Sequence, residues 1–146
     1  MTFLLSLLLA APRPLTEQDL KAGRAVFQRE CAACHGERGD GNGAGAAFVD
    51  PKPRNFTKKM FKLRTTNSGE PPATADILRT IERGIPGSAM PSFKFLSEQE
   101  RRQLAAVVLD FADMLDGDEP TPIKDPGAPP SMTPQTIARG KQVYEA

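Results

Sequence analysis

The feature that most constrains this chain is the pentapeptide Cys31-Ala-Ala-Cys-His35, which contains both cysteines and the only histidine of its 146 residues. In a helical turn, side chains three and four positions apart lie on one face. The two thiols and the imidazole are therefore predicted to lie near one point. Any fold of this chain has to be built around that reactive turn.

This spacing is typical of covalent haem attachment. The thiols of Cys31 and Cys34 can add to the two vinyl groups of one haem, and the adjacent His35 then reaches the iron from one face. We expect one haem c per chain, attached through Cys31 and Cys34, with His35 as the proximal iron ligand.

Three other interpretations of the motif were considered. A zinc site requires four ligands, and Cys and His supply three here. A thioredoxin-like redox pair occurs in a βαβ context, and no alternation typical of strands is visible. A disulfide between cysteines this close closes too short a loop to stabilise much. Haem attachment is the interpretation that the sequence favours.

The sixth position on the iron has fewer candidates. A second histidine is absent from the sequence, so methionine is the natural ligand. Of the five methionines, Met60 and Met90 are neither at a terminus nor in an ordinary helix-packing position. Met90 lies in GIPGSAMPSF, where prolines and glycines fix the backbone. We predict Met90 as the distal ligand, with Met60 or an open site as the alternatives.

Three amphipathic segments predict helices within a compact all-α domain over 15–115. The first begins after Thr16, the second spans about 74–84, and the third begins after Ser97 with a capping box to Glu100. Long loops rich in glycine and proline separate them. Three helices with such loops form a poor core unless a large group fills the middle, which agrees with a haem.

The segments outside 15–115 are read separately. Residues 1–14 contain an apolar run of signal-peptide length, far short of the roughly 20 residues that span a bilayer. We expect a leader for export, the alternative being an uncleaved N-terminus, and we expect no membrane-spanning segment. Residues 116–132 are a linker rich in proline and aspartate.

Residues 133–146 repeat the pattern of the first helix. When Thr16 is aligned with Thr133, Gly23 and Val26 coincide with Gly140 and Val143, and Phe27 with Tyr144. We therefore interpret 133–146 as the start of a second, truncated domain of the same kind, whose Cys-x-x-Cys-His would begin two positions beyond Ala146. A capped helix that matches by chance is the alternative.

Residues 15–115 resemble a class I cytochrome c in the CAACHG motif, the glycine-rich GDGNGAG, the GIPGSAMPSF loop and the closing helix. The resemblance implies an all-α fold with the first and last helices crossing near Gly23. It also implies single-electron transfer, with Cys31 and Cys34 as anchors and His35 and Met90 as axial ligands. The His35 ring is then expected to donate to a carbonyl near Pro51 or Pro53. Family members are exported, so a periplasmic location or the outer face of the cytoplasmic membrane is expected.

The long segment FVDPKPRNFTKKMFKLRTTNSGEPP is similar to insertions in cytochrome subunits and multihaem cytochromes of bacterial respiratory complexes. We therefore expect redox proteins or respiratory complex subunits as partners. The segment is basic and has two interpretations: a solvated loop with one Arg near the haem propionates, or a docking patch for an acidic partner. The cations are Lys52, Arg54, Lys58, Lys59, Lys62 and Arg64.

The chain has 19 basic and 18 acidic residues, which leaves a formal net charge of +1. This balance indicates no nucleic-acid partner. The main function predicted is an electron carrier rather than an enzyme. The alternative is a peroxidase-like haem enzyme, in which the sixth ligand is open or displaced and a distal acid or base acts on an oxygen substrate.

Overall fold

The computed structural model describes residues 16–125 and 127–145, so the leader predicted at 1–14 lies outside the described residues. Within that part the chain is helical and contains no strand, which confirms the all-α fold. The elements are α1 (Glu17–Glu30), α2 (Ala32–His35), α3 (Thr74–Arg83), α4 (Glu98–Phe111) and α5 (Pro134–Glu145), with short 3-10 turns η1 (Ala44–Phe48) and η2 (Phe56–Lys58).

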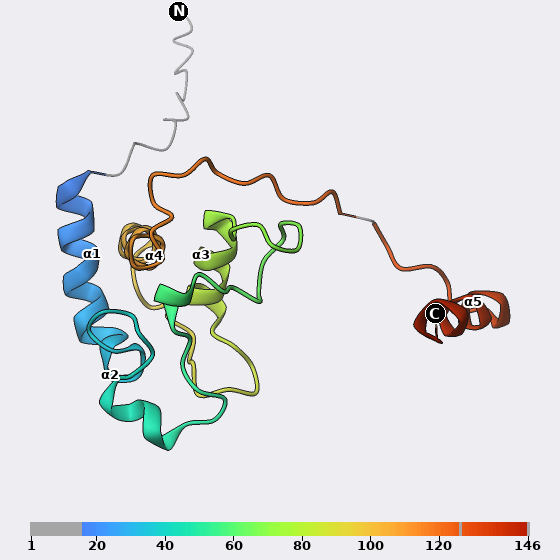
Figure 1. Ribbon diagram of the computed structural model, residues 1–146, viewed down its shortest axis with the longest axis horizontal. Coiled ribbons are helices and arrows are strands. Elements are labelled where there is room, and N and C mark those ends of the chain that lie inside the picture. Colours follow the sequence, from blue (N-terminus) through green and yellow to red (C-terminus); the bar gives the residue numbers. More distant parts are fainter. Residues whose placement is uncertain (1–15, 126, 146) are drawn as a thin grey trace, which may run out of the picture.

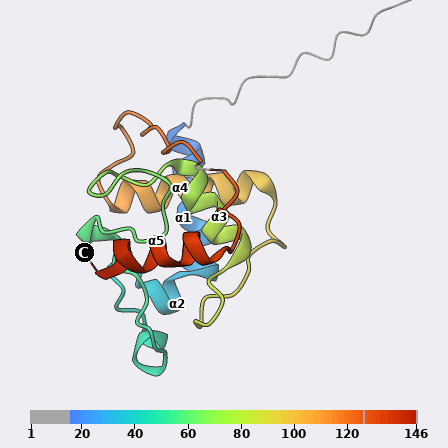
Figure 2. The same cartoon turned by 90° about the vertical axis from the view of Figure 1, so that its right-hand side faces the viewer.

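The α1–α4 crossing forms the centre of the domain. These two helices make the most extensive contact in the fold, and α4 is seen end-on in Figure 1 and lengthwise in Figure 2. At the crossing a Cβ on Gly23 would lie 2.5 Å from the carbonyl oxygen of Gln103 and 2.9 Å from Cγ2 of Val107. Glycine therefore lets the backbones approach, and the expected crossing near Gly23 is confirmed.

The predicted N-caps of both helices are present. Thr16 Oγ1 accepts from the Asp19 amide at 3.2 Å, and Ser97 Oγ accepts from the Glu100 amide at 3.2 Å. Asp19 does more than close a capping box, because its buried carboxylate also accepts from Gln103 Nε2 at 3.1 Å. One acidic side chain thus starts α1 and links it to α4.

The core is formed by the inner faces of α1, α3 and α4. Phe27, Leu104 and Val107 are fully buried, and Ile77 and Ile81 of α3 pack against the same cluster. These are the apolar positions that helical periodicity assigns to one face. The core therefore lies between the three main helices, and the long loops run around it.

A buried carboxylate fixes the long segment before α3. Asp76 is 1% exposed and accepts from the amides of Thr65 at 2.8 Å and Ala73 at 3.1 Å, and it also pairs with Arg79. Because an unpaired buried carboxylate is costly, these partners have to be held in place. Asp76 therefore anchors both the loop and the start of its own helix.

The segment after α4 has two parts. Its first residues return to the domain: Glu119 accepts from the Thr74 amide and hydroxyl at 2.6 Å each, and the Ile123 amide donates to the Thr65 carbonyl at 2.7 Å. The last part contains α5, which lies apart from the other helices (Figure 1). Of the helices in the described ranges, none is long and apolar enough to cross a membrane.

Candidate functional site

The Cys-x-x-Cys-His motif forms a single helical turn directly after α1. The Cys31 amide closes α1 by donating to the Phe27 carbonyl at 2.8 Å, and the His35 amide donates to the Cys31 carbonyl at 2.9 Å. Both thiols are free and half-buried. The structure thus brings Cys31, Cys34 and His35 together at the end of α1, as the sequence predicts.

The glycine-rich loop packs directly on this turn. The Gly41 amide donates to the His35 carbonyl at 2.8 Å, and the Gly43 amide donates to the Cys34 carbonyl at 3.2 Å. A Cβ on Gly43 would lie 2.3 Å from the Ala33 carbonyl oxygen, closer than side chains can approach. The loop therefore satisfies the carbonyls that the short helix leaves without partners.

The His35 imidazole is held at its edge and on its face. Nδ1 lies 3.0 Å from the carbonyl oxygen of Arg54. A carbonyl can only accept, so Nδ1 carries the proton and Nε2 keeps its lone pair for a metal. The acceptor is the carbonyl of Arg54, the residue directly after Pro53, which agrees with the carbonyl near Pro51 or Pro53 expected from the sequence. The Phe56 ring stacks on the imidazole with centroids 4.7 Å apart and planes at 17°.

Burial shifts the acid–base behaviour of the motif. It lowers the pKa of His35, which keeps the imidazole neutral and able to bind a metal. It also raises the pKa of the Cys31 thiol to about 11, with Glu30 and Cys34 adding smaller effects in the same direction. A redox-active cysteine pair needs a thiol of low pKa. The raised pKa of Cys31 is therefore a second argument against the thioredoxin-like interpretation.

Met90 lies on a separate loop that follows α3. The Met90 amide donates to Ser88 Oγ at 3.2 Å, and its carbonyl accepts from the Ile85 amide at 3.1 Å. The Phe93 amide then donates to the Ile81 carbonyl of α3 at 3.0 Å. The Met90 side chain is half-buried and packs against the same core as Cys31.

Met60 and Met114 lie in different environments from Met90. Met60 is 62% exposed, so its thioether faces solvent. Met114 is half-buried, lies three residues after α4 ends and packs on the core, as a gap-filling side chain does. Within 16–125 and 127–145, no group of three or more His, Cys, Asp or Glu residues is arranged to hold a metal ion. A haem, which brings its own four nitrogen ligands, does not need such a cluster.

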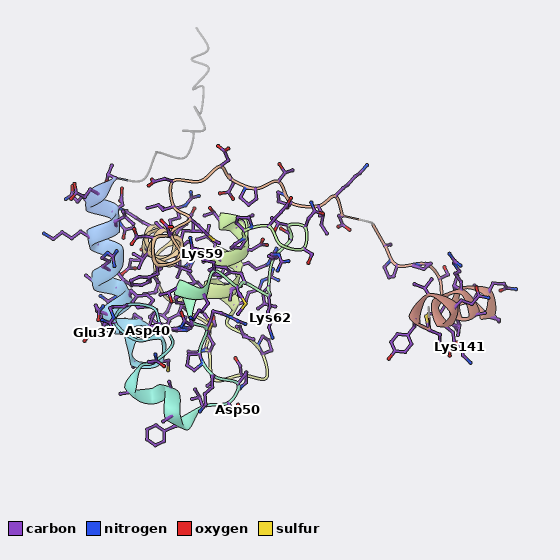
Figure 3. All side chains as sticks on the ribbon, in the orientation of Figure 1. Glu37, Asp40, Asp50, Lys59, Lys62 and Lys141 are labelled. Atoms are coloured by element: carbon purple, nitrogen blue, oxygen red, sulfur yellow. The ribbon has the colours of Figure 1, made fainter. Side chains whose placement is uncertain are left out.

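The cations of the basic segment differ in whether they have partners, which the sequence does not indicate. Lys52 donates to the carbonyls of Ala46 and Ala47, Lys59 pairs with Asp113 at 2.9 Å, and Arg64 donates to the carbonyls of Phe61 and Asn67. Figure 3 shows Lys59 beside α4, and Lys62 farther from it. Within the described residues, the side chains of Arg54, Lys58 and Lys62 have no hydrogen-bond or ion-pair partner.

The donor set fits a c-type haem. Two thiols and one imidazole with a free Nε2 lie on one turn, and the half-buried Cys31, Phe61 and Met90 lie around one apolar core. Phe56 is the site residue that sequence reasoning missed. The sequence could have indicated Phe56, because it directly follows PKPRN and lies two residues after Arg54, whose carbonyl orients His35.

Comparison with known proteins agrees with this geometry. The cytochrome c family model matches residues 20–110. Cytochrome c6 of Synechocystis is 35% identical over 96 residues, which cover 65% of this chain and 68% of the relative. A chain of the Kuenenia stuttgartiensis reducing HAO-like protein complex is 40% identical with a TM-score of 0.78. That match covers 93% of this chain and 60% of the solved chain, so this chain spans less than two thirds of it.

The match to the family covers the motif turn, the glycine-rich loop, the Met90 loop and the α1–α4 crossing. A covalently bound c-type haem with its iron is therefore the cofactor, and haem-based electron transfer is the activity class. On these grounds the chain belongs to the cytochrome c family.

Proposed function

We propose that this protein is a single-electron carrier with one haem c per described domain and His35 and Met90 as axial ligands. The observation that carries the proposal is the Met90 loop, which hydrogen bonds hold at Ile85, Ser88 and Phe93. A weak thioether ligand requires such a rigid support, and the half-buried side chain packs against the same core as the motif turn.

The haem supplies an iron that alternates between ferrous and ferric states, and the protein sets its environment. His35 is held as a neutral ligand by the Arg54 carbonyl. The Met90 thioether, as a ligand, would favour the ferrous state and so raise the reduction potential. Cys31 and Cys34 would anchor the group covalently, so that it cannot dissociate between reduction and oxidation.

The ligand assignment is tested with Met90→Ala and a matched control, Met60→Ala. The wild type should have a low-spin spectrum with a methionine-to-iron charge-transfer band. Met90→Ala should lose the band and Met60→Ala should retain it, because the Met60 side chain is largely exposed. Loss of the band in Met60→Ala alone would transfer the distal role to Met60.

The alternative is a haem enzyme, and the likeness to a chain of an HAO-like complex is the observation that keeps it open. An enzyme needs an exchangeable sixth position, whereas a carrier does not. We expect the ferric protein to bind cyanide, and the ferrous protein to bind CO, only in denaturant. A high-spin ferric spectrum with ready binding of either ligand would favour the enzyme.

We propose a redox protein, such as a subunit of a bacterial respiratory complex, as the partner. The unpaired cations Arg54, Lys58 and Lys62 support a docking surface for an acidic protein, because their charges are not neutralised within the domain. Figure 3 places Glu37 and Asp40 near α2, away from Lys62.

Lys62→Glu should slow reduction by the partner at low ionic strength. Lys141→Glu, on α5, should not, and rates insensitive to salt would contradict docking.

The setting we propose is an exported protein with a second haem domain that begins at α5, so that electrons are relayed within one polypeptide. The apolar run at 3–11 supports export to the periplasm or to the outer face of the cytoplasmic membrane. The match of 93% of this chain to a longer solved chain extends well past α4 and supports the second domain. Two haems per native polypeptide, measured as iron against protein mass, are expected. One haem per native polypeptide would contradict the relay.

A further inference from the structure

We propose that Phe56 is a positioning residue for the axial ligand, because its ring fixes the plane of the His35 imidazole. The inference rests on the proposed function, since it requires His35 to bind the iron. It goes further by naming the side chain that controls the orientation of the His35 ring plane.

The arrangement of the two rings carries the proposal. Their centroids are 4.7 Å apart and their planes are within 17° of parallel, so the flat face of Phe56 covers the face of the imidazole. Phe56 itself cannot move freely. It is 9% exposed, its amide donates to the Gly39 carbonyl at 2.8 Å, and it begins η2.

The neighbouring rings hold Phe56 in place. Phe27 packs edge-on at 6.4 Å, and Phe61 lies nearly parallel at 6.3 Å with planes at 11°. Phe27 belongs to α1, the helix that ends at the motif. Its contact with Phe56 therefore fixes the position of the Phe56 ring relative to that helix. The stack therefore transmits the rigidity of the core to the imidazole.

The hydrogen bond to Arg54 is not sufficient for this purpose. It fixes one atom of the ring, Nδ1, and hydrogen bonds tolerate a broad range of angles. A ring held only by that bond could still tilt. The Arg54 carbonyl and the Phe56 ring are two residues apart on one segment, so the edge and the face of His35 are fixed together.

Two measurable properties follow. The orientation of the imidazole plane determines which iron orbitals it overlaps, and this sets the g values of the low-spin ferric state. The apolar Phe56 ring also replaces solvent on one face of the imidazole, and lower polarity near the iron would disfavour the more highly charged ferric state and raise the potential. Phe56 therefore affects the iron through His35 and without touching it.

The experiment compares Phe56→Leu, Phe56→Tyr and Phe61→Leu in the haem-loaded protein by electron paramagnetic resonance and redox titration. Phe56→Leu should broaden or shift the g values and lower the midpoint potential. Phe56→Tyr retains a ring over the imidazole and should restore both. Phe61→Leu removes a ring that supports Phe56 but leaves the Phe56 ring over the imidazole, so its shift in g values should be smaller than that of Phe56→Leu.

A purely structural Phe56 predicts a different result. In that case Phe56→Leu would lower the denaturation midpoint and leave the g values and potential unchanged, which would overturn the proposal. If Phe56→Leu does not mature with haem, Phe56→Met, which has an unbranched side chain and no ring, provides the same comparison. Failure of the proposed function is distinguishable, because the wild type itself would then lack a low-spin His/Met spectrum.

Discussion

Helices α1 and α5 share one sequence pattern and have opposite environments. Each begins at a threonine that accepts from the amide three residues on at 3.2 Å, Thr16 in α1 and Thr133 in α5. Phe27 of α1 is 1% exposed, whereas Tyr144 at the aligned position is 92% exposed. The comparison teaches that local sequence is enough to form a helix, while burial of its apolar face requires the surface of a partner helix.

The partner surface is what α4 supplies to α1. Gly23 meets the Gln103 carbonyl, whereas a Cβ on Gly140 would meet nothing within 4 Å. The same residue type at the same helical position is therefore essential for packing in one helix and dispensable in the other. Paired substitutions in α1 and α5 measure this difference directly.

The largest expected effect is that of Phe27→Ala against Tyr144→Ala. Removing the fully buried ring of Phe27 should lower the free energy of unfolding by about 3–5 kcal/mol. Removing the exposed ring of Tyr144 should change it by less than about 0.5 kcal/mol. Denaturant unfolding of the haem-loaded protein measures both. Equal losses would mean that α5 is packed in solution.

The next effect is that of Gly23→Ala against Gly140→Ala. A methyl group at Gly23 would collide with the α4 backbone, and overpacking of this kind costs about 1–3 kcal/mol. At Gly140 the same methyl group has free space and should favour the helix by up to about 1 kcal/mol. Thermal unfolding reports the first variant and far-ultraviolet circular dichroism the second. A tolerated alanine at position 23 would contradict the close crossing.

A smaller effect is expected for Thr16→Ala against Thr133→Ala. Loss of an N-cap costs about 1 kcal/mol, and at Thr16 this should appear as a lower unfolding free energy of the domain. At Thr133 only the helicity of α5 should fall, because α5 lies apart from the core. The two signals can be separated by amide hydrogen exchange. A lower unfolding free energy of the domain in Thr133→Ala would instead show that α5 and the domain are coupled.

The smallest effect is a pH dependence at the capping box of α4, which contains the carboxylate of Glu100. Hydrogen bonds from Ser97 lower the pKa of Glu100 below its ordinary value. The stabilisation is then complete above the unfolded pKa and is lost as the pH falls through the folded pKa. Thr136 replaces the carboxylate in α5, so that cap should not titrate. A pH titration by nuclear magnetic resonance should give Glu100 a depressed pKa, and Glu100→Gln should remove the dependence.

Local features of the fold could be predicted from the sequence. Thr16 and Ser97 were correctly predicted as caps because a cap depends on residues within one turn. The close grouping of Cys31, Cys34 and His35 was likewise predicted, since a single helical turn contains all three. The all-α fold followed from helical periodicity and from the family resemblance.

Long-range features could not be predicted in this way. Asp76 reads as an ordinary residue in the first turn of a helix, and its buried bonds to Thr65 and Ala73 depend on how the preceding loop returns. The stack of Phe56 on His35 joins residues on separate elements, which no periodic pattern contains. Three of the six predicted docking cations are hydrogen-bonded or paired within the domain, because sequence shows charge and not its partners.

The bonds of Glu119 to Thr74 bear on how such a domain can be transplanted. A gene fusion that joins a cytochrome of this kind to another protein at Leu115, where the last core helix has ended, would remove the side chain that caps α3. A junction after Ile123 would keep that cap and the bond to Thr65. The folding unit thus extends past α4 to Ile123, and a fusion junction within 116–123 should weaken the start of α3.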